Sequence, residues 1–155
     1  MKKTCLGFTL IELLVVISII GILFVIGIAQ YMNFNRRQIL DQAAQELKNN
    51  LRFAQGKALA GEKPASWCVD PKHLRGYRLK FNSSGSYIIE ASCSDGNFQL
   101  IKSVNLPSSI TGPSGTSVLF KVLAQGIEGL TTSFTLSYSG VGSKAVVVTK
   151  EGKIE

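Results

Sequence analysis

The residues from Phe8 to Ala29 form an almost uninterrupted apolar run, and one carboxylate, Glu12, lies inside it. As a helix, a run of about 22 residues can span the roughly 30 Å of a bilayer's hydrocarbon core. A charge near the middle of a bilayer costs roughly 2.5–3.5 kcal/mol even on lenient insertion scales. A plain anchor gains nothing from that cost. We therefore expect Glu12 to have a positively charged partner from a neighbouring subunit.

The leader before this run is short and basic, and it ends in Gly7. A secretory signal peptide has its small-residue cleavage site after the apolar stretch, whereas Gly7 comes before it. Cleavage after Gly7 would leave the apolar helix on the mature protein. Lys2 and Lys3 predict a cytoplasmic N-terminus, with the rest of the chain outside, by the positive-inside rule. The alternative is a single-span signal anchor with a stray glutamate.

The segment from Gly7 to Val16 closely resembles the prepilin signature of type IV pilins and type II secretion pseudopilins. The resemblance implies that prepilin peptidase cleaves between Gly7 and Phe8 and that the new Phe8 terminus is N-methylated. It implies that Glu12 neutralises the Phe8 amine of an adjacent subunit in a filament. It also implies that the partners are other pilin or pseudopilin subunits.

Beyond the apolar run, the helical pattern continues to about Ala60, and Gly61 and Pro64 mark its end. A helix from Phe8 to Ala60 would be near 80 Å long, at about 1.5 Å per residue. Its first half is apolar all round and must be buried in lipid or among other helices. Its second half has one apolar stripe, which predicts that it covers a sheet. The stripe consists of Leu40, Ala43, Ala44, Leu47, Leu51, Ala54 and Ala58.

From Trp67 onward the apolar residues alternate, as in half-buried strands. A turn at 82–85 predicts a hairpin, and Phe98, Leu100 and Lys102 are expected on one side of their strand. The expected strands are 77–81, 86–91, 97–104, 117–123, 133–138 and 145–149. A long helix followed by short strands predicts an α+β fold, with the helix packed on an antiparallel sheet. The predicted organisation is a leader at 1–7, a transmembrane or filament-core helix at 8–30, and a periplasmic or extracellular pilin-like domain at 31–155.

The cysteines divide at the expected cleavage site. Cys5 would leave with the leader, whereas Cys68 and Cys93 stay on the exported side. An even pair in an oxidising compartment predicts a disulfide bond, and the alternative is two separate buried thiols. A loop of about 25 residues predicts roughly 3–4 kcal/mol of stabilisation. Neither cysteine belongs to a CxxC motif and His73 is the only histidine, so no metal site and no cofactor are expected.

The C-terminal part has a more diffuse resemblance, to the H-type minor pseudopilins (GspH) and the FimT-type minor pilins. It rests on the segments 51–58, 76–79 and 146–154. Some FimT-type members bind DNA through a C-terminal Gly-Arg segment. Here Gly152 and Lys153 hold that place, with Lys144 and Lys150 nearby. Lysine lacks the planar fork of arginine. The candidate DNA-binding residues are thus Lys144, Lys150 and Lys153, and a solvated hairpin is the favoured interpretation.

The formal net charge of +7 would fall to +5 with the loss of Lys2 and Lys3. Such an excess indicates an anionic partner only weakly, and a solvated basic surface explains it as well. The sequence has no P-loop, HExxH or GxSxG motif, and His73 lies in a loop-like segment. We therefore expect no enzyme activity.

Together these features predict a minor pilin or minor pseudopilin of the inner membrane that later joins a periplasmic or cell-surface filament. The alternatives are a DNA-binding minor pilin that serves uptake, or a major pilin. A membrane-anchored enzyme is a more distant alternative.

Overall fold

The computed structural model describes residues 9–65, 67–124 and 126–155. The chain divides into two units, and helix α1 (Leu10–Ala60) crosses the boundary between Arg37 and Gln38. The strands belong to the second unit. They are β1 (Leu74–Ser83), β2 (Ser86–Cys93), β3 (Phe98–Asn105), β4 (Ile110–Thr111), β5 (Ser117–Lys121), β6 (Ile127–Glu128), β7 (Thr132–Tyr138) and β8 (Gly142–Val148). A helix followed by antiparallel strands confirms the predicted α+β fold.

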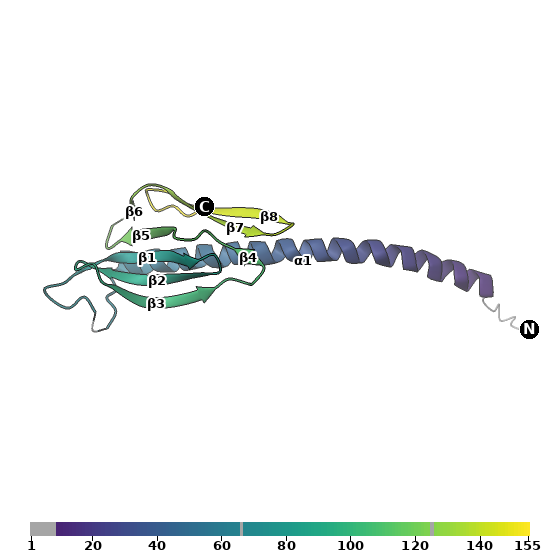
Figure 1. Ribbon diagram of the computed structural model, residues 1–155, viewed down its shortest axis with the longest axis horizontal. Coiled ribbons are helices and arrows are strands. Elements are labelled where there is room, and N and C mark those ends of the chain that lie inside the picture. The colour runs from purple at the N-terminus through teal and green to yellow at the C-terminus, as the bar shows by residue number, and fades with distance from the viewer. Residues whose placement is uncertain (1–8, 66, 125) are drawn as a thin grey trace, which may run out of the picture. The chain divides into compact units, whose positions relative to one another are not determined.

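The apolar stripe on the second half of α1 is the face that covers the sheet (Figure 1). All seven stripe residues are buried, and Leu47, Leu51, Ala54 and Ala58 have no exposed surface. The polar residues between them, such as Gln42 and Arg52, are exposed. The 3.6-residue period of the sequence therefore located the buried face correctly, because one turn of a helix returns to the same side every three to four residues.

Gly61 ends α1 as the sequence indicated. Its φ is +61°, a left-handed conformation that glycine adopts without a steric penalty. The Gly61 N–H donates to the carbonyl of Ala58, and the Glu62 N–H donates to that of Lys57. These two bonds form a Schellman motif, which satisfies carbonyls that the last turn leaves without helical partners. The N–H of Leu123, after β5, also donates to the Ala58 carbonyl, so the helix end is tied to the sheet.

The strands form two antiparallel sheets rather than the single sheet expected. The larger has the order β3-β2-β1-β5-β6, and the smaller has the order β4-β7-β8. Both contribute to one core with α1, and the rings of Phe81 and Phe134 meet across them with centroids 5.7 Å apart. The two-residue strands β4 and β6 fall in segments without a strand pattern, because pairing with β7 and β5 creates them.

The expected hairpin at 82–85 is present, since β1 and β2 pair from Ser83–Ser86 inward. The expectation that Phe98, Leu100 and Lys102 share one side of β3 is wrong. Leu100 pairs with Glu90 but Lys102 pairs with Ile89, so the ladder has an extra residue between them. A bulge of one residue exchanges the two faces of a strand, and Lys102 therefore lies on the same side as the buried Ile89.

Candidate functional site

The start of α1 is organised by Thr9 and Glu12. The hydroxyl oxygen of Thr9 accepts a bond of 3.3 Å from the Glu12 N–H. In return, Glu12 Oε2 accepts the Thr9 N–H at 3.1 Å and the Thr9 hydroxyl at 2.8 Å. This reciprocal arrangement is a capping box, in which two helix-terminal N–H groups gain acceptors. Glu12 therefore has a structural role that our sequence analysis missed, although the spacing of Thr9 and Glu12 is its known signature.

Capping uses one oxygen of the Glu12 carboxylate. For Oε1, no hydrogen-bond partner is found within the part of the chain that the structure describes. A carboxylate can accept about four hydrogen bonds, so a cap and a cationic partner are compatible on the same group. Gly7 and Phe8 lie outside the described residues, so cleavage between them, methylation of Phe8 and pairing of Glu12 with a Phe8 amine stay predictions.

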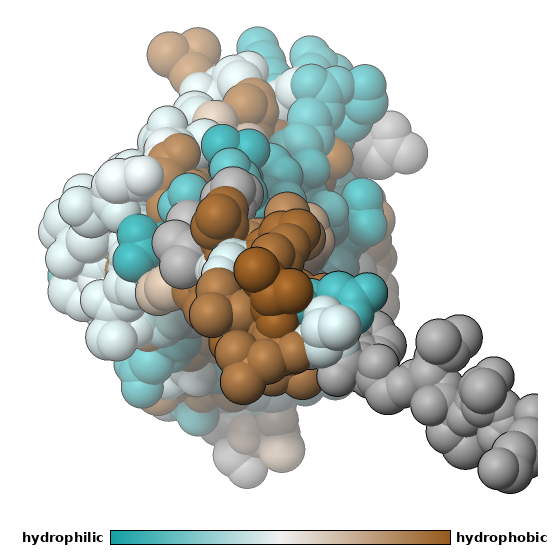
Figure 2. Space-filling view, turned by 90° about the vertical axis from the view of Figure 1, so that its right-hand side faces the viewer, coloured by the Kyte–Doolittle hydropathy of each residue, from teal (hydrophilic) through white to brown (hydrophobic). Residues whose placement is uncertain are grey.

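The side chains of α1 that follow Glu12 are apolar on every face of the helix. The large apolar residues from Leu10 to Phe24 have between 46% and 82% of their surface exposed. Figure 2 looks toward the side of the N-terminal end of α1, and a brown, hydrophobic patch faces the viewer there. The Ser18 hydroxyl donates to the Leu14 carbonyl at 2.8 Å, so this polar side chain is satisfied within the helix. Contiguous apolar surface of this extent marks an interaction site.

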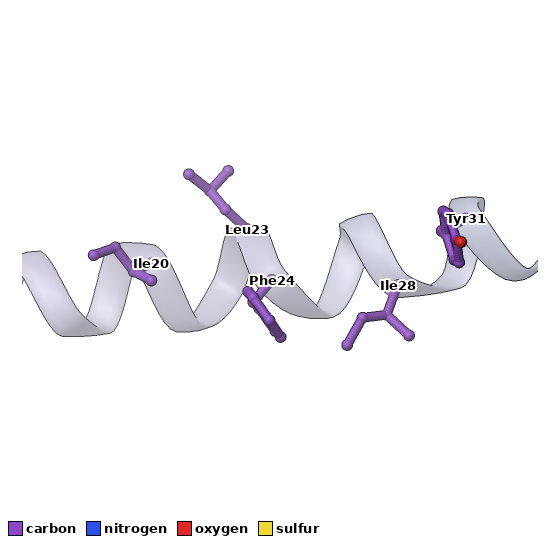
Figure 3. A pocket seen from close by; sticks show the side chains of 5 residues that line it. All are labelled: Ile20, Leu23, Phe24, Ile28 and Tyr31. Atoms are coloured by element: carbon purple, nitrogen blue, oxygen red, sulfur yellow. The ribbon is translucent and has the colours of Figure 1, made fainter.

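One shallow groove runs along this apolar surface in the first unit. It is lined by Ile20, Leu23, Phe24, Ile28 and Tyr31. Figure 3 shows the five side chains projecting from a single helix, so the groove is a surface between neighbouring side chains rather than an enclosed cavity. Among the described residues, we find no helix that is long and apolar enough to cross a membrane. The transmembrane role expected for residues 8–30 stays a prediction.

The disulfide bond expected between Cys68 and Cys93 is present. It joins the segment after α1 to the end of β2, and the two Cα atoms are 5.6 Å apart. Beside it, Lys72 Nζ lies 2.7 Å from Asp95 Oδ2. The hydrogen bond from Lys72, together with that from the Asn97 N–H, holds the pKa of Asp95 at about 2. The αβ connection is therefore fixed by one covalent bond and one ion pair.

The three candidate DNA-binding lysines lie in different parts of the C-terminal segment. Lys144 lies within β8 and pairs with Asp41 of α1. Lys150 and Lys153 lie beyond the end of β8, and Lys153 pairs with Glu155 at 2.5 Å. The carbonyl of Gly152, at the same turn, accepts a bond of 2.8 Å from the Gln55 side chain of α1. Two of the three ammonium groups thus have carboxylate partners, which lowers the local positive charge.

Within the described residues, no three His, Cys, Asp or Glu side chains are grouped so that they could hold a metal ion. His73 lies just before β1 and is exposed. Its N–H donates to the Ser94 hydroxyl at 3.2 Å.

Comparison with known proteins places the N-terminal segment in a family. The family described as "Prokaryotic N-terminal methylation motif" matches residues 2–28, which include Gly7, Phe8 and Glu12. A relative named "Fimbrial protein" from Pseudomonas aeruginosa is 37% identical over 78 residues, covering 50% of this chain and 49% of the relative. A "Type IV major fimbrial protein FimA" from Dichelobacter nodosus is 41% identical over 68 residues, 44% of this chain and 42% of the relative.

These matches support a place for the chain in the type IV pilin superfamily. A second FimA from Dichelobacter nodosus is 28% identical to this chain over 134 residues, 86% of the chain and 74% of the relative. In the first of these matches, the chain spans about half the length of the curated relatives. No solved structure matches it.

Proposed function

We propose that this chain is a filament subunit, a minor pilin of a type IV pilus or a minor pseudopilin of a type II secretion system. Prepilin peptidase cleaves it after Gly7 and Phe8 is then methylated. The helix at 8–30 holds the subunit in the inner membrane before assembly and packs among other subunits afterwards. The observation that carries the proposal is a helix start that is apolar on all faces and contains one capped carboxylate, Glu12.

Burial of the first half of α1 supplies the driving force for both steps. Fully burying one large aliphatic or aromatic side chain contributes roughly 1.5–3 kcal/mol. At least twelve such residues are exposed between Leu10 and Phe24. A bilayer covers them in the unassembled subunit, and equivalent helices of other subunits cover them in the filament. Because both environments are apolar, the helix exchanges one for the other without exposing this surface to water.

Glu12 gives the helix contact a register that apolar packing alone does not supply. In an apolar environment a carboxylate is costly unless it meets a positive group. The Phe8 amine of an adjacent subunit supplies this positive group at only one axial position. If the subunits shift along the helix axis, the Glu12 carboxylate and the Phe8 amine are both left unpaired. The capping bonds from Thr9 fix the direction of the carboxylate, which favours a defined approach of the amine.

A major pilin is the second candidate, because two relatives are named as major fimbrial proteins. The discriminating measurement is the abundance of the subunit in sheared filaments, where a major pilin is the dominant protein. DNA binding by a minor pilin is a third candidate. The ion pairs of Lys144 and Lys153 count against it.

The test of the proposal separates the charge of Glu12 from its capping role. Glu12→Gln keeps an oxygen that can accept the Thr9 bonds but removes the charge, whereas Thr9→Ala removes the two capping bonds of the Thr9 hydroxyl and keeps the charge. In a host with an active prepilin peptidase, we expect both variants to lose the leader and gain one methyl group, as read by intact mass. Cross-linking should then show that Glu12→Gln fails to enter filaments and that Thr9→Ala enters them. Wild-type assembly by Glu12→Gln, or a wild-type chain that retains its leader, would contradict the proposal.

A further inference from the structure

The outer face of the larger sheet, opposite the core, carries a hollow of about 390 Å³. Its lining includes Arg75, Arg78, Ser92, Phe98, Leu119 and Glu128. The strand register explains this grouping, because directly paired residues in antiparallel strands share a face. Arg78 pairs with Glu90 on β2 and with Leu119 on β5, while Ser92 pairs with Gly76 on β1 and with Phe98 on β3. Together with Glu128 of β6, five strands thus contribute to one site on this face.

Gly76 is the partner of Ser92 on β1. It carries no side chain, and a Cβ built there would lie 2.0 Å from the backbone oxygen of Phe120. Any other residue would push β1 away from β5, since real Cβ atoms do not approach so closely. Glycine is therefore required by the contact between β1 and β5.

Arg78 is held in a fixed orientation at the edge of this hollow. Its Nε and Nη2 donate to Glu90 Oε2 at 3.1 and 2.5 Å, and its Cζ lies 3.6 Å from the ring centroid of Phe98. A guanidinium has five N–H donors, so Nη1 keeps its two. Arg75 pairs through Nη2 with Glu128, and about half of the Arg75 side chain is exposed. Both arginines thus have donors beyond those used in their ion pairs.

Ser92 adds a donor that the chain does not use. Its side chain lines the hollow and is 1% exposed, and within the described residues its Oγ has no hydrogen-bond partner. A buried hydroxyl without a partner costs about 1–3 kcal/mol. The unmatched groups of the hollow are therefore arginine N–H donors and a serine hydroxyl that can donate or accept, whereas the carboxylates of Glu90 and Glu128 already bind arginine. A ligand that completes the site must supply acceptors for the arginines.

We propose that this hollow binds a sugar acid through its carboxylate. The carboxylate accepts hydrogen bonds from Arg75 and Arg78, whose planar guanidinium groups match the two oxygens of a carboxylate. The sugar ring packs against Leu119, and its hydroxyls reach Ser92 and the exposed carboxylate of Glu128. The volume is at the small end of the range for ligand pockets, which fits one sugar ring. The two arginines are balanced by two glutamates, so a monoanion suits the site better than a dianionic phosphate.

The test uses the full chain in detergent micelles, with D-glucuronate as the probe, followed by amide NMR. D-glucose is the neutral comparison, and inorganic phosphate is the other oxyanion. We expect saturable shifts in β1, β2 and β5 with glucuronate at millimolar concentration, and binding about tenfold weaker or more with glucose and with phosphate. Equal binding of glucose, tighter binding of phosphate, or no saturable shift with glucuronate would overturn the proposal.

Variants locate the binding. Arg75→Gln and Ser92→Ala should each weaken glucuronate binding, the first by about tenfold, because a bond to a charged group is stronger than one to a neutral group. Arg75 is half exposed, so its loss leaves the core unchanged. Arg52→Gln removes the same charge from the exposed face of α1 and is the matched control. Equal loss in Arg52→Gln, or full binding by Arg75→Gln, would show that this hollow is not the site.

Discussion

The side-chain nitrogen of Asn50 donates a hydrogen bond of 2.7 Å to the hydroxyl of Tyr87, inside the contact between α1 and β2. Asn50 Oδ1 accepts a bond of 2.9 Å from Lys102 Nζ on β3. Asn50 is 5% exposed and Tyr87 is fully buried. Burial raises the pKa of Tyr87 to about 12, although the bond with Asn50 opposes the shift. Asn50 thus links the buried Tyr87 of β2 to the exposed Lys102 of β3 at the edge of the core.

We expect Tyr87→Phe to lower the free energy of unfolding by about 1–3 kcal/mol, because it leaves the Asn50 amide buried without its acceptor. Tyr138→Phe is the matched control, since Tyr138 is only half-buried. Chemical denaturation of the full chain in detergent, followed by near-UV circular dichroism, measures the difference. Equal stability of the two variants would show that the bond contributes nothing.

Reducing the Cys68–Cys93 bond should destabilise the second unit by about 3 kcal/mol, as expected for a closed loop of 25 residues. Cys68→Ser should have the same effect, and Cys5→Ser should have none. Thermal unfolding of oxidised, reduced and variant protein tests this expectation. Peptide mapping of exported protein without reduction should recover the two cysteines linked, and recovery of free thiols after rapid alkylation would argue against the bond.

The Lys72–Asp95 ion pair predicts a pH dependence at the acidic end. The folded pKa of Asp95 is about 2, below its ordinary value of 3.8. A depressed carboxyl pKa contributes stability above the unfolded pKa and loses it as the pH falls through the folded pKa. We expect Asp95→Asn to melt below wild type at pH 7 and the two melting temperatures to converge between about pH 4 and pH 2. Asp70→Asn, a change of an exposed residue in the same region, is the control. A difference in melting temperature between Asp95→Asn and wild type that stays constant with pH would contradict the depressed pKa of Asp95.

We expect the full chain to bind duplex DNA only within the non-specific range of roughly 10⁻⁴–10⁻⁶ M at physiological salt. The reason is that Lys144 and Lys153 already have carboxylate partners. Titration of labelled duplex at two salt concentrations measures the affinity. The test variant combines Lys150→Ala with Lys153→Ala, and the control variant combines Lys63→Ala with Lys121→Ala. Binding well below micromolar that is lost in the first pair and kept in the second would favour a role in DNA uptake.

Several features could be read from the sequence because neighbouring residues determine them. The apolar stripe of α1 has the helical period, and Gly61 supplies the left-handed residue that ends the helix. The pairing of Cys68 with Cys93 was predicted from the expected loss of Cys5 with the leader and from an expected oxidising compartment, and the bond is present. The N-terminal motif could also be recognised because its residues are neighbours in the sequence. Its capping box was visible in the same four residues, although we recognised only the charge of Glu12.

Other features were decided by tertiary structure. Lys102 turns toward the core because an extra residue in β3 exchanges its faces, and nothing in the alternating pattern indicated that bulge. Asn50 is buried because Tyr87 and Lys102 satisfy its amide, and Lys144 and Lys153 pair with Asp41 and Glu155. The hollow on the outer face of the larger sheet exists because five strands align there. Helix period and capping are set by residues a few positions apart, whereas strand register and ion-pair partners depend on which distant segments meet when the chain folds.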